Sequence, residues 1–378
     1  MPRSSERGYE YWLYEQNYDE LAEFYKYVNN FLVTSKGKIN ILIVNCEGSI
    51  KNELDVWEPQ NFKVKTSGED NFFKLEITKL FEDRQTDEIR KDTVKARVIK
   101  YQDYPLYLIF SECTKTKFKN IITKLMNKHY PTISRLFLTN NEIKNICNQL
   151  ERDTRNEIIV EFSHGKKRLF GTKKKKISQM TYTNEHFSTV FEKIYTSNQW
   201  VESIRFVAGV VINEKTGEVS EPKYQGVLSR GCFFSAEKRF SPFIDIIIPY
   251  AIKFAYGKNE YLKVRSLKAT QENPEPIVIN FQDDIFSDVA ENRNFVDAFN
   301  DLDKVSVSSY HSNPYIHLSL LDYLDGSSYD LWVVSQNRLI IYPQFSASTA
   351  SMNRIVNHIF ERIREGVVEE FKDIELRQ

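Results

Sequence analysis

Residues 313–366 read NPYIHLSLLDYLDGSSYDLWVVSQNRLIIYPQFSASTASMNRIVNHIFERIREG, and the spacing of their hydrophobic residues changes within this one stretch. Its first part contains three short runs rich in β-branched and aromatic residues, at 315–321, 330–334 and 338–342. Turn-forming residues separate these runs, first DGSS and then QN. Runs of this kind predict strands, so we expect a three-stranded meander.

The second part of the stretch has the period of a helix. Ser346, Ser348 and Thr349 are candidate N-caps, and Gly366 is typical of the residue that follows a helix C-terminus. The sequence therefore predicts a helix over residues 350–365 that packs on the meander. The hydrophobic residues on one helical stripe are Met352, Ile355, Val356, Ile359, Phe360 and Ile363.

Length and composition predict a folded protein with more than one unit. The chain has 378 residues, which exceeds one typical domain. Hydrophobic residues make up 41%, and 26 Phe and 21 Tyr supply large side chains for a core. The 52 basic and 52 acidic residues balance, which argues against indiscriminate binding to nucleic acid or membranes but leaves room for local charged segments.

Cysteine usage and the N-terminus predict a cytoplasmic protein with no membrane partner. Cys46, Cys113, Cys147 and Cys232 are far apart and form no Cys-x-x-Cys pair, so a disulfide framework or a structural zinc site is not expected. The first residues are charged and aromatic, and no apolar run reaches the ~18 residues that a membrane span needs. The many Lys, Asn and Ile residues indicate an AT-rich microbial genome.

We expect an α+β fold in which amphipathic helices cover antiparallel sheets. Residues 61–97 alternate between apolar and polar, which favours solvated antiparallel strands. If the strands are instead joined as βαβ units, the alternative is an α/β fold with parallel strands. Buried strands are predicted at 39–45, 104–110 and 157–162, and helices at 115–130, 140–150, 241–256 and 283–299.

The chain is expected to fold as two halves. A strand, a hydroxyl-rich cap and a helix follow each other in both halves, at 104–130 and again at 338–363, which suggests a distant resemblance. We predict an N-terminal half over residues 1–152, which contains the basic helix 115–130. The C-terminal half, residues 153–378, would contain the basic loop 164–177, the long hairpin 200–230 and the meander with its helix at 313–366.

Two basic segments are the most distinctive feature of the sequence. Residues 111–135 hold six basic side chains against the single acid Glu112, and residues 164–177 hold seven with no acid. If strands 104–110 and 157–162 are parallel neighbours, both segments leave the same edge of a sheet. The alternative is a solvated lysine run, or one that pairs with the acidic region 272–303. The candidate phosphate-binding residues are Lys115, Lys119, Lys166, Lys167, Arg168, Lys173, Lys174, Lys175 and Lys176.

Residues that could support catalysis are few. Asp284, Asp288 and Glu291 are spaced by four and three, so a helix would place them on one face, where they could hold Mg²⁺ or Mn²⁺. His311 and His317 lack the spacing of zinc ligands. No set of nucleophile, base and orienting group is evident, so we expect no complete active site and no cofactor.

These observations favour a non-catalytic nucleic-acid-binding protein, or a subunit of a microbial nucleic-acid-handling complex, with phosphate contacts through the Lys-rich loop and helix. One alternative is a metal-dependent nuclease. The other is a scaffolding subunit whose charged segments bind a protein partner or a second copy of the chain.

Overall fold

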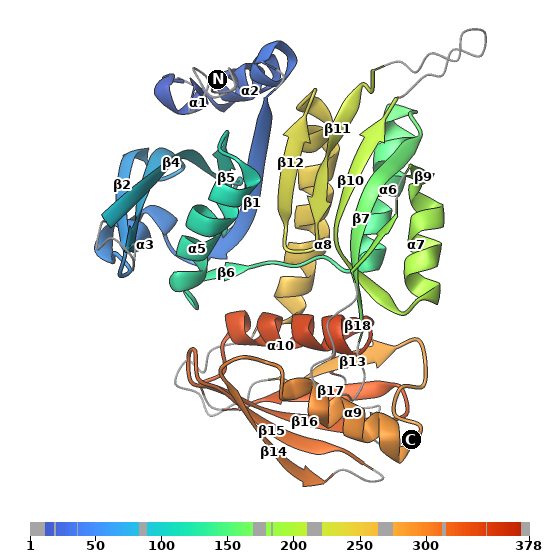
Figure 1. The fold of residues 1–378 in the computed structure, drawn as a ribbon. Helices are drawn as coiled ribbons and strands as arrows, with labels where there is room; N and C mark the ends of the chain where they lie inside the picture. The colour runs from blue at the N-terminus through green and yellow to red at the C-terminus, as the bar shows by residue number, and fades with distance from the viewer. Residues whose placement is uncertain are drawn as a thin grey trace, which may run out of the picture. The chain divides into compact units, whose positions relative to one another are not determined.

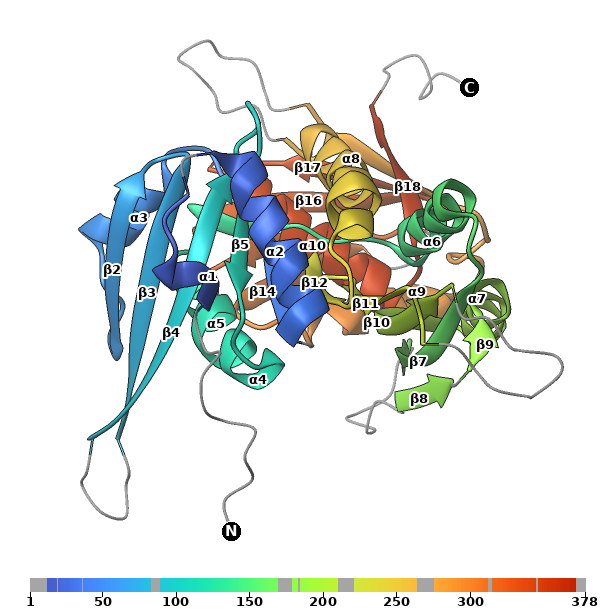
Figure 2. The same ribbon diagram turned by 90° about the horizontal axis from the view of Figure 1, so that it is seen from above.

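The computed structural model describes residues 12–18, 20–35, 37–82, 89–168, 179–182, 184–209, 221–263, 275–311, 315–344 and 346–371 of the chain (Figures 1 and 2). The chain folds into two compact units that alternate along the sequence. Unit 1 comprises residues 1–164, 181–192 and 202–251, and unit 2 comprises residues 165–180, 193–201 and 252–378. The division expected after residue 152 lies inside unit 1.

Helices and strands are mixed along the chain. The helices are α1 (Trp12–Glu15), α2 (Leu21–Ser35), α3 (Ile50–Val56), α4 (Lys115–Phe118), the π-helical segment η1 (Lys119–Thr123), α5 (Lys124–Lys128), α6 (Asn140–Thr154), α7 (Phe187–Thr196), the π-helical segment η2 (Phe243–Ile247), α8 (Ile248–Tyr261), α9 (Val289–Phe299) and α10 (Thr349–Arg362). The strands are β1 (Lys38–Cys46), β2 (Phe62–Glu69), β3 (Phe72–Glu82), β4 (Ile89–Lys100), β5 (Leu106–Ser111), β6 (Ile133–Arg135), β7 (Ile158–Lys167), β8 (Gln179–Tyr182), β9 (Glu185–His186), β10 (Gln199–Ala208), β11 (Tyr224–Ser229), β12 (Phe233–Glu237), β13 (Ile277–Phe281), β14 (Val305–His311), β15 (His317–Asp322), β16 (Ser327–Ser335), β17 (Arg338–Pro343) and β18 (Gly366–Glu370).

The larger sheet has twelve strands in the order β2-β3-β4-β5-β1-β12-β11-β10-β7-β8, with β6 paired to β1 and β9 paired to β7. Every register defined among its described residues is antiparallel. The smaller sheet is antiparallel throughout as well. The α+β class with antiparallel sheets is therefore confirmed. None of these registers has the parallel strands of the alternative α/β fold.

Strand β1 lies at the centre of the larger sheet because its sequence, KINILIVNC, is apolar toward both faces. Leu42 belongs to a fully buried cluster with Ile121 of the helix that follows β5. Ile41 faces the other way and pairs with Phe110 of β5, whose ring contacts Phe24 of α2 at 5.3 Å between centroids. Helices on both sides of the strand thus explain why it is buried on both faces.

The smaller sheet belongs to unit 2 and has the order β14-β15-β16-β17-β13-β18. The predicted meander is confirmed, because β15, β16 and β17 are consecutive antiparallel neighbours. Helix α10 lies along one face (Figure 1). It ends at Arg362, and Gly366 opens β18 where it was expected to follow the helix. A Cβ at Gly366 would lie 2.7 Å from the backbone oxygen of Asn280, so close strand pairing requires glycine there.

The two sheets contain segments with the same order of elements. One runs β1, α3, the meander β2 to β5, the helix α4 to α5, and β6. The other runs β13, α9, the meander β14 to β17, α10, and β18. In each, the first strand pairs with the last strand of the meander and with the closing strand. A common origin of the two segments stays a prediction.

Candidate nucleic-acid interface

The basic helix predicted over residues 115–130 is present as α4, η1 and α5, which run without a break from Lys115 to Lys128. The side-chain oxygen of Thr114 caps the helix by accepting a hydrogen bond from the backbone N–H of Lys117 at 3.3 Å. Phe118, Ile121 and Met126 are fully buried under the sheet. This burial turns the opposite face to the surface, and the exposed lysines on it are Lys115, Lys119, Lys124 and Lys128.

Lys79 of strand β3 adds a fifth ammonium group to this face. Its Nζ donates to the backbone oxygen of Asn120 at 3.1 Å, and it lies 4.7 Å from the ring centroid of Phe81. Partial burial lowers the pKa of Lys79, and the positive charges of Lys124 and Lys128 lower it further. The ammonium groups of Lys79, Lys124 and Lys128 therefore lie in one region of unit 1.

Lys115 shows the same effect at the other end of the helix. Its Nζ lies 5.9 Å from the ring centroid of Phe233. Desolvation lowers the pKa of Lys115, and Lys119 is the largest of the neighbouring charges that lower it further. Lys117 differs, because it forms an ion pair with Asp92 at 3.3 Å. We call the set Lys79, Lys115, Lys119, Lys124 and Lys128 the helix-lysine surface.

A second basic region lies on the opposite face of strands β2, β3 and β4. Phe73, Leu75 and Ile77 of β3 point to the helix, so the alternate residues point away from it. There they line a groove with a volume of about 630 Å³. We call it the sheet groove, and its lining residues are Lys63, Lys65, Glu76, Thr78, Leu80, Lys91 and Thr93.

The sheet groove is basic but not uniformly so. Glu76 lies directly across from Lys65 on β2 and from Lys95 on β4. Thr78 and Thr93 share a hydrogen bond of 2.9 Å between their hydroxyls. A carboxylate directly across from a lysine neutralises part of its charge, so the groove is less basic than its three lysines alone would make it.

The basic loop is described only at its start. Lys166 is half-buried, with its Nζ 5.1 Å from the ring centroid of Trp200. Lys167 belongs to β7, and its side chain lies outside the described residues. The run from Lys173 through Lys174 and Lys175 to Lys176 lies outside them entirely.

Arg168 is placed differently from the expectation of a phosphate contact. Its side chain is 5% exposed. The guanidinium donates to the backbone oxygens of Phe360 and Gln199 and lies 3.6 Å from the carboxylate of Glu365. These contacts bury Arg168 and link it to other segments of unit 2. An arginine held in this way is a structural residue and not a phosphate contact at the surface.

The two strands that precede the basic segments are not neighbours. Strand β5 precedes the helix and β7 precedes the loop, but β1, β12, β11 and β10 lie between them in the sheet. The expectation of parallel neighbouring strands is therefore wrong. In both places a basic segment follows a strand in the sequence. The positions of the two strands in the sheet depend instead on pairing between strands that are distant in the sequence.

The three carboxylates proposed as metal ligands do not share a helix face. Helix α9 begins at Val289, so Asp284 precedes it and Asp288 is its N-cap. The Asp288 carboxylate accepts from the N–H of Glu291 at 2.7 Å, and Glu291 accepts from the N–H and hydroxyl of Ser287. These contacts cap the helix. Within the described ranges, no three His, Cys, Asp or Glu side chains are grouped as a metal site.

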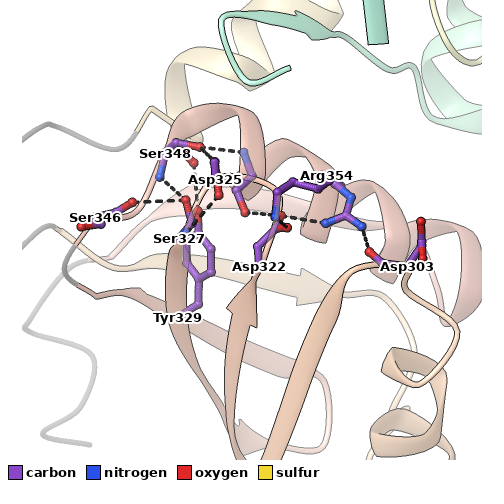
Figure 3. A network of polar contacts seen from close by, with 10 residues as sticks. Asp303, Asp322, Asp325, Ser327, Tyr329, Ser346, Ser348 and Arg354 are labelled. Atoms are coloured by element: carbon purple, nitrogen blue, oxygen red, sulfur yellow. Dashed lines mark hydrogen bonds and ion pairs between the residues drawn. The ribbon is translucent and has the colours of Figure 1, made fainter. Parts of the chain in front are cut away.

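A polar network joins the β15–β16 turn to the start of α10 (Figure 3). Asp322 is fully buried and accepts from Ser351 Oγ at 2.8 Å and from Arg354 at 2.7 Å. Ser348, the N-cap of α10, donates from its hydroxyl to Asp325, and Tyr329 donates to the Ser348 backbone oxygen at 2.9 Å. Each contact satisfies a polar group at the helix start, so the network stabilises the fold.

Sequence reasoning missed Lys79 and the lysines of the sheet groove. The alternation of residues 62–65, FKVK, contained the signal, since it puts both lysines on one face of the strand. No helix in the described part of the chain has the length and hydrophobicity to cross a membrane. Comparison of the sequence with models of protein families and with curated proteins gave no match.

Proposed function

We propose that this protein binds nucleic acid through its phosphates, and that the helix-lysine surface of unit 1 makes the contacts. The observation that carries the proposal is the gathering of Lys79, Lys124 and Lys128, whose charges act on one another across a strand and a helix. Such repulsion is relieved when an anion is bound between the ammonium groups. Because most of its lysines follow one another along a helix, the helix-lysine surface suits a ligand with many negative charges.

The contacts are expected to position the nucleic acid and not to read its sequence. All five groups of the helix-lysine surface are lysines, which act as mobile point charges. Bidentate recognition of a base edge needs the planar fork of arginine or an amide. Binding should therefore be similar for different sequences and should fall steeply with salt.

The test is a salt titration with a matched control. We would measure the fluorescence anisotropy of a labelled duplex between about 50 and 200 mM salt, with wild-type protein and the variant Lys119→Ala/Lys124→Ala/Lys128→Ala. The slope of log K against log salt should flatten by up to about 2.7, at about 0.9 per lost duplex contact. The control, Lys63→Ala/Lys65→Ala/Lys91→Ala, removes the same charge from the sheet groove on the opposite face.

The outcomes are distinct. Absence of wild-type binding at low salt would refute nucleic-acid binding. A larger loss in the sheet-groove variant than in the helix variant would refute the assignment to the helix-lysine surface. The run Lys173 to Lys176 stays a predicted second contact, and its fourfold replacement by alanine belongs in the same titration. Addition of Mg²⁺ or Mn²⁺ tests the nuclease alternative, since cleavage that Asp288→Ala abolishes would contradict a non-catalytic role.

A further inference from the structure

The smaller sheet of unit 2 carries a row of aromatic rings on one face. Tyr310, His317, Trp332 and Tyr342 come from the four consecutive strands β14, β15, β16 and β17. Their neighbouring ring centroids are 5.0, 5.1 and 4.9 Å apart. Tyr310 is 67% exposed and Trp332 is 42% exposed. We call these four residues the ring row.

A row of buried leucines lies on the other face of this sheet. Leu318, Leu331 and Leu339 of the same strands are fully buried. Because residues alternate between the two faces of a strand, these leucines point away from the ring row. Large aromatic side chains left in contact with water on a single face are typical of a surface that binds a partner.

Carboxylates and ring faces give this surface a preference for cations. Asp330 lies beside the ring row, where one oxygen accepts from Gln344 at 3.0 Å. Its other oxygen is 3.9 Å from Nε2 of His317, too far for a hydrogen bond, and that nitrogen has no hydrogen-bond partner. Asp330 pairs with Tyr342 across β16 and β17, and its side chain is partly exposed. The faces of aromatic rings are also negative, so they attract cations as the carboxylates do.

Arg338 of β17 is already held by its neighbours. Arg338 Nε donates to Asn280 Oδ1 at 2.9 Å. The amide of Asn280 in turn donates to the Glu369 carboxylate at 2.8 Å. This chain of contacts compensates the charge of Arg338 within the protein. The carboxylate of Asp330 therefore supplies negative charge beside the ring row.

We propose that the ring row is a docking surface for an arginine-containing, extended segment of a partner protein. A guanidinium stacks on the ring of Trp332 or Tyr310 while its N–H groups donate to the Asp330 carboxylate. Arginine suits this surface better than lysine because its planar group both stacks and forms two parallel hydrogen bonds. The Asp330 carboxylate and the negative ring faces disfavour phosphates here, so this partner is distinct from the ligand proposed for unit 1.

The experiment uses the full chain and a fluorescein-labelled peptide, Gly-Arg-Gly-Arg-Gly-Arg-Gly, whose alternate arginines lie on one side when it is extended. Anisotropy gives the affinity. Because the chain has four tryptophans, the difference in emission between the wild type and Trp332→Ser reports contact with the ring row. Trp332→Ser and Asp330→Asn should each weaken binding by about tenfold, as loss of a stacked or ion-paired arginine contact does. The lysine peptide of the same length should bind several-fold more weakly.

Matched controls separate this surface from general effects. Trp57→Ser removes an exposed tryptophan from unit 1, and Asp284→Asn removes one exposed charge from a loop of unit 2. Neither variant should change the affinity by more than about twofold, as is usual for a surface substitution outside a binding site. Equal binding of the wild type, Trp332→Ser and Asp330→Asn would overturn the proposal. So would an oligonucleotide that quenches the part of the emission removed by Trp332→Ser, or self-association of the free protein that Trp332→Ser abolishes.

Discussion

At the scale of single residues, His358 should make the stability of unit 2 depend on pH. It is 7% exposed, and its Nε2 lies 2.8 Å from the backbone oxygen of Ala298. Burial lowers the pKa of His358 from 6.5 to about 4. Arg362 and Arg354 act in the same direction, while the hydrogen bond to Ala298 and the charge of Asp301 oppose them. The folded state therefore favours the neutral form of His358.

The sign of the effect follows from this lowered pKa. The contribution of His358 is fully present above pH 6.5, where the side chain is neutral in both states, and it is lost as pH falls toward 4. The loss should reach up to about 3 kcal/mol, at 1.36 kcal/mol for each unit of pKa. Urea unfolding between pH 4 and 7 measures it. His358→Gln should flatten that dependence and His311→Gln, at an exposed position, should not; equal curves for all three proteins would contradict the argument.

Arg168 shows which part of the candidate site could not be foreseen from single residues. In the sequence it stands among lysines and resembles them in charge. Its partners Phe360 and Glu365 are almost 200 positions away, and they bury it. The exposed lysines of the helix could be predicted, because their positions follow from the helical period alone. A side chain whose environment is set by a distant segment gives no local signal.

At the scale of elements, two glycines should respond in opposite ways to replacement by alanine. Gly257 lies inside α8, although the sequence suggested that the helix ends just before it, and a Cβ there meets nothing within 4 Å. Gly226 lies in β11, and a Cβ there would come within 2.3 Å of the Phe243 ring and 2.5 Å of the Ser235 backbone oxygen.

Gly257→Ala should stabilise the protein by about 0.5–1 kcal/mol, since alanine loses less conformational freedom in a helix. Gly226→Ala should destabilise it by about 1–3 kcal/mol or more, because a strand and a helix must move apart. The two variants add the same methyl group, so each is the control for the other. Thermal unfolding compares them, and a lower melting temperature for Gly257→Ala would contradict the placement of that residue.

Local patterns predicted the elements better than their ends. The meander β15 to β17 and helix α10 follow from periods that span only a few residues. The end of α10 could not be predicted in this way, because Gly366 allows β18 to lie close to β13 and does not cap the helix. The acidic helix began later than expected, since Asp288 is a better N-cap than a helix residue. Capping and strand contacts, which compete with periodicity at element ends, account for both differences.

At the scale of the whole molecule, the sequence could indicate the fold class but not which strands are neighbours. Unit 2 takes residues 165–180 and 193–201 from the middle of the chain, so its boundaries are not composition shifts along the sequence. The separation of β5 from β7 has the same cause. Pairing between distant strands depends on the whole set of competing edges, and no short window of sequence contains that information.

The balance of charge in the whole chain leads to a last prediction. The net charge is zero, yet residues 89–128 hold 10 basic and 3 acidic side chains, while residues 275–371 hold 15 acidic and 6 basic. Without net repulsion, the basic segment of one molecule can attract the acidic segment of another. At about 20 mM salt and pH 7 we expect weak, concentration-dependent association, which disappears at about 300 mM salt as the screening length falls well below 10 Å.

Sedimentation at the two salt concentrations measures this association. Lys119→Ala/Lys124→Ala/Lys128→Ala should reduce it at low salt, because the variant removes positive charge from the exposed helix face and gives the chain a net negative charge that adds repulsion. Trp332→Ser leaves the charges unchanged and should leave the association unchanged. Association that persists at high salt would show that apolar contacts hold the molecules together, because salt screens charge attraction but does not weaken the burial of apolar surface.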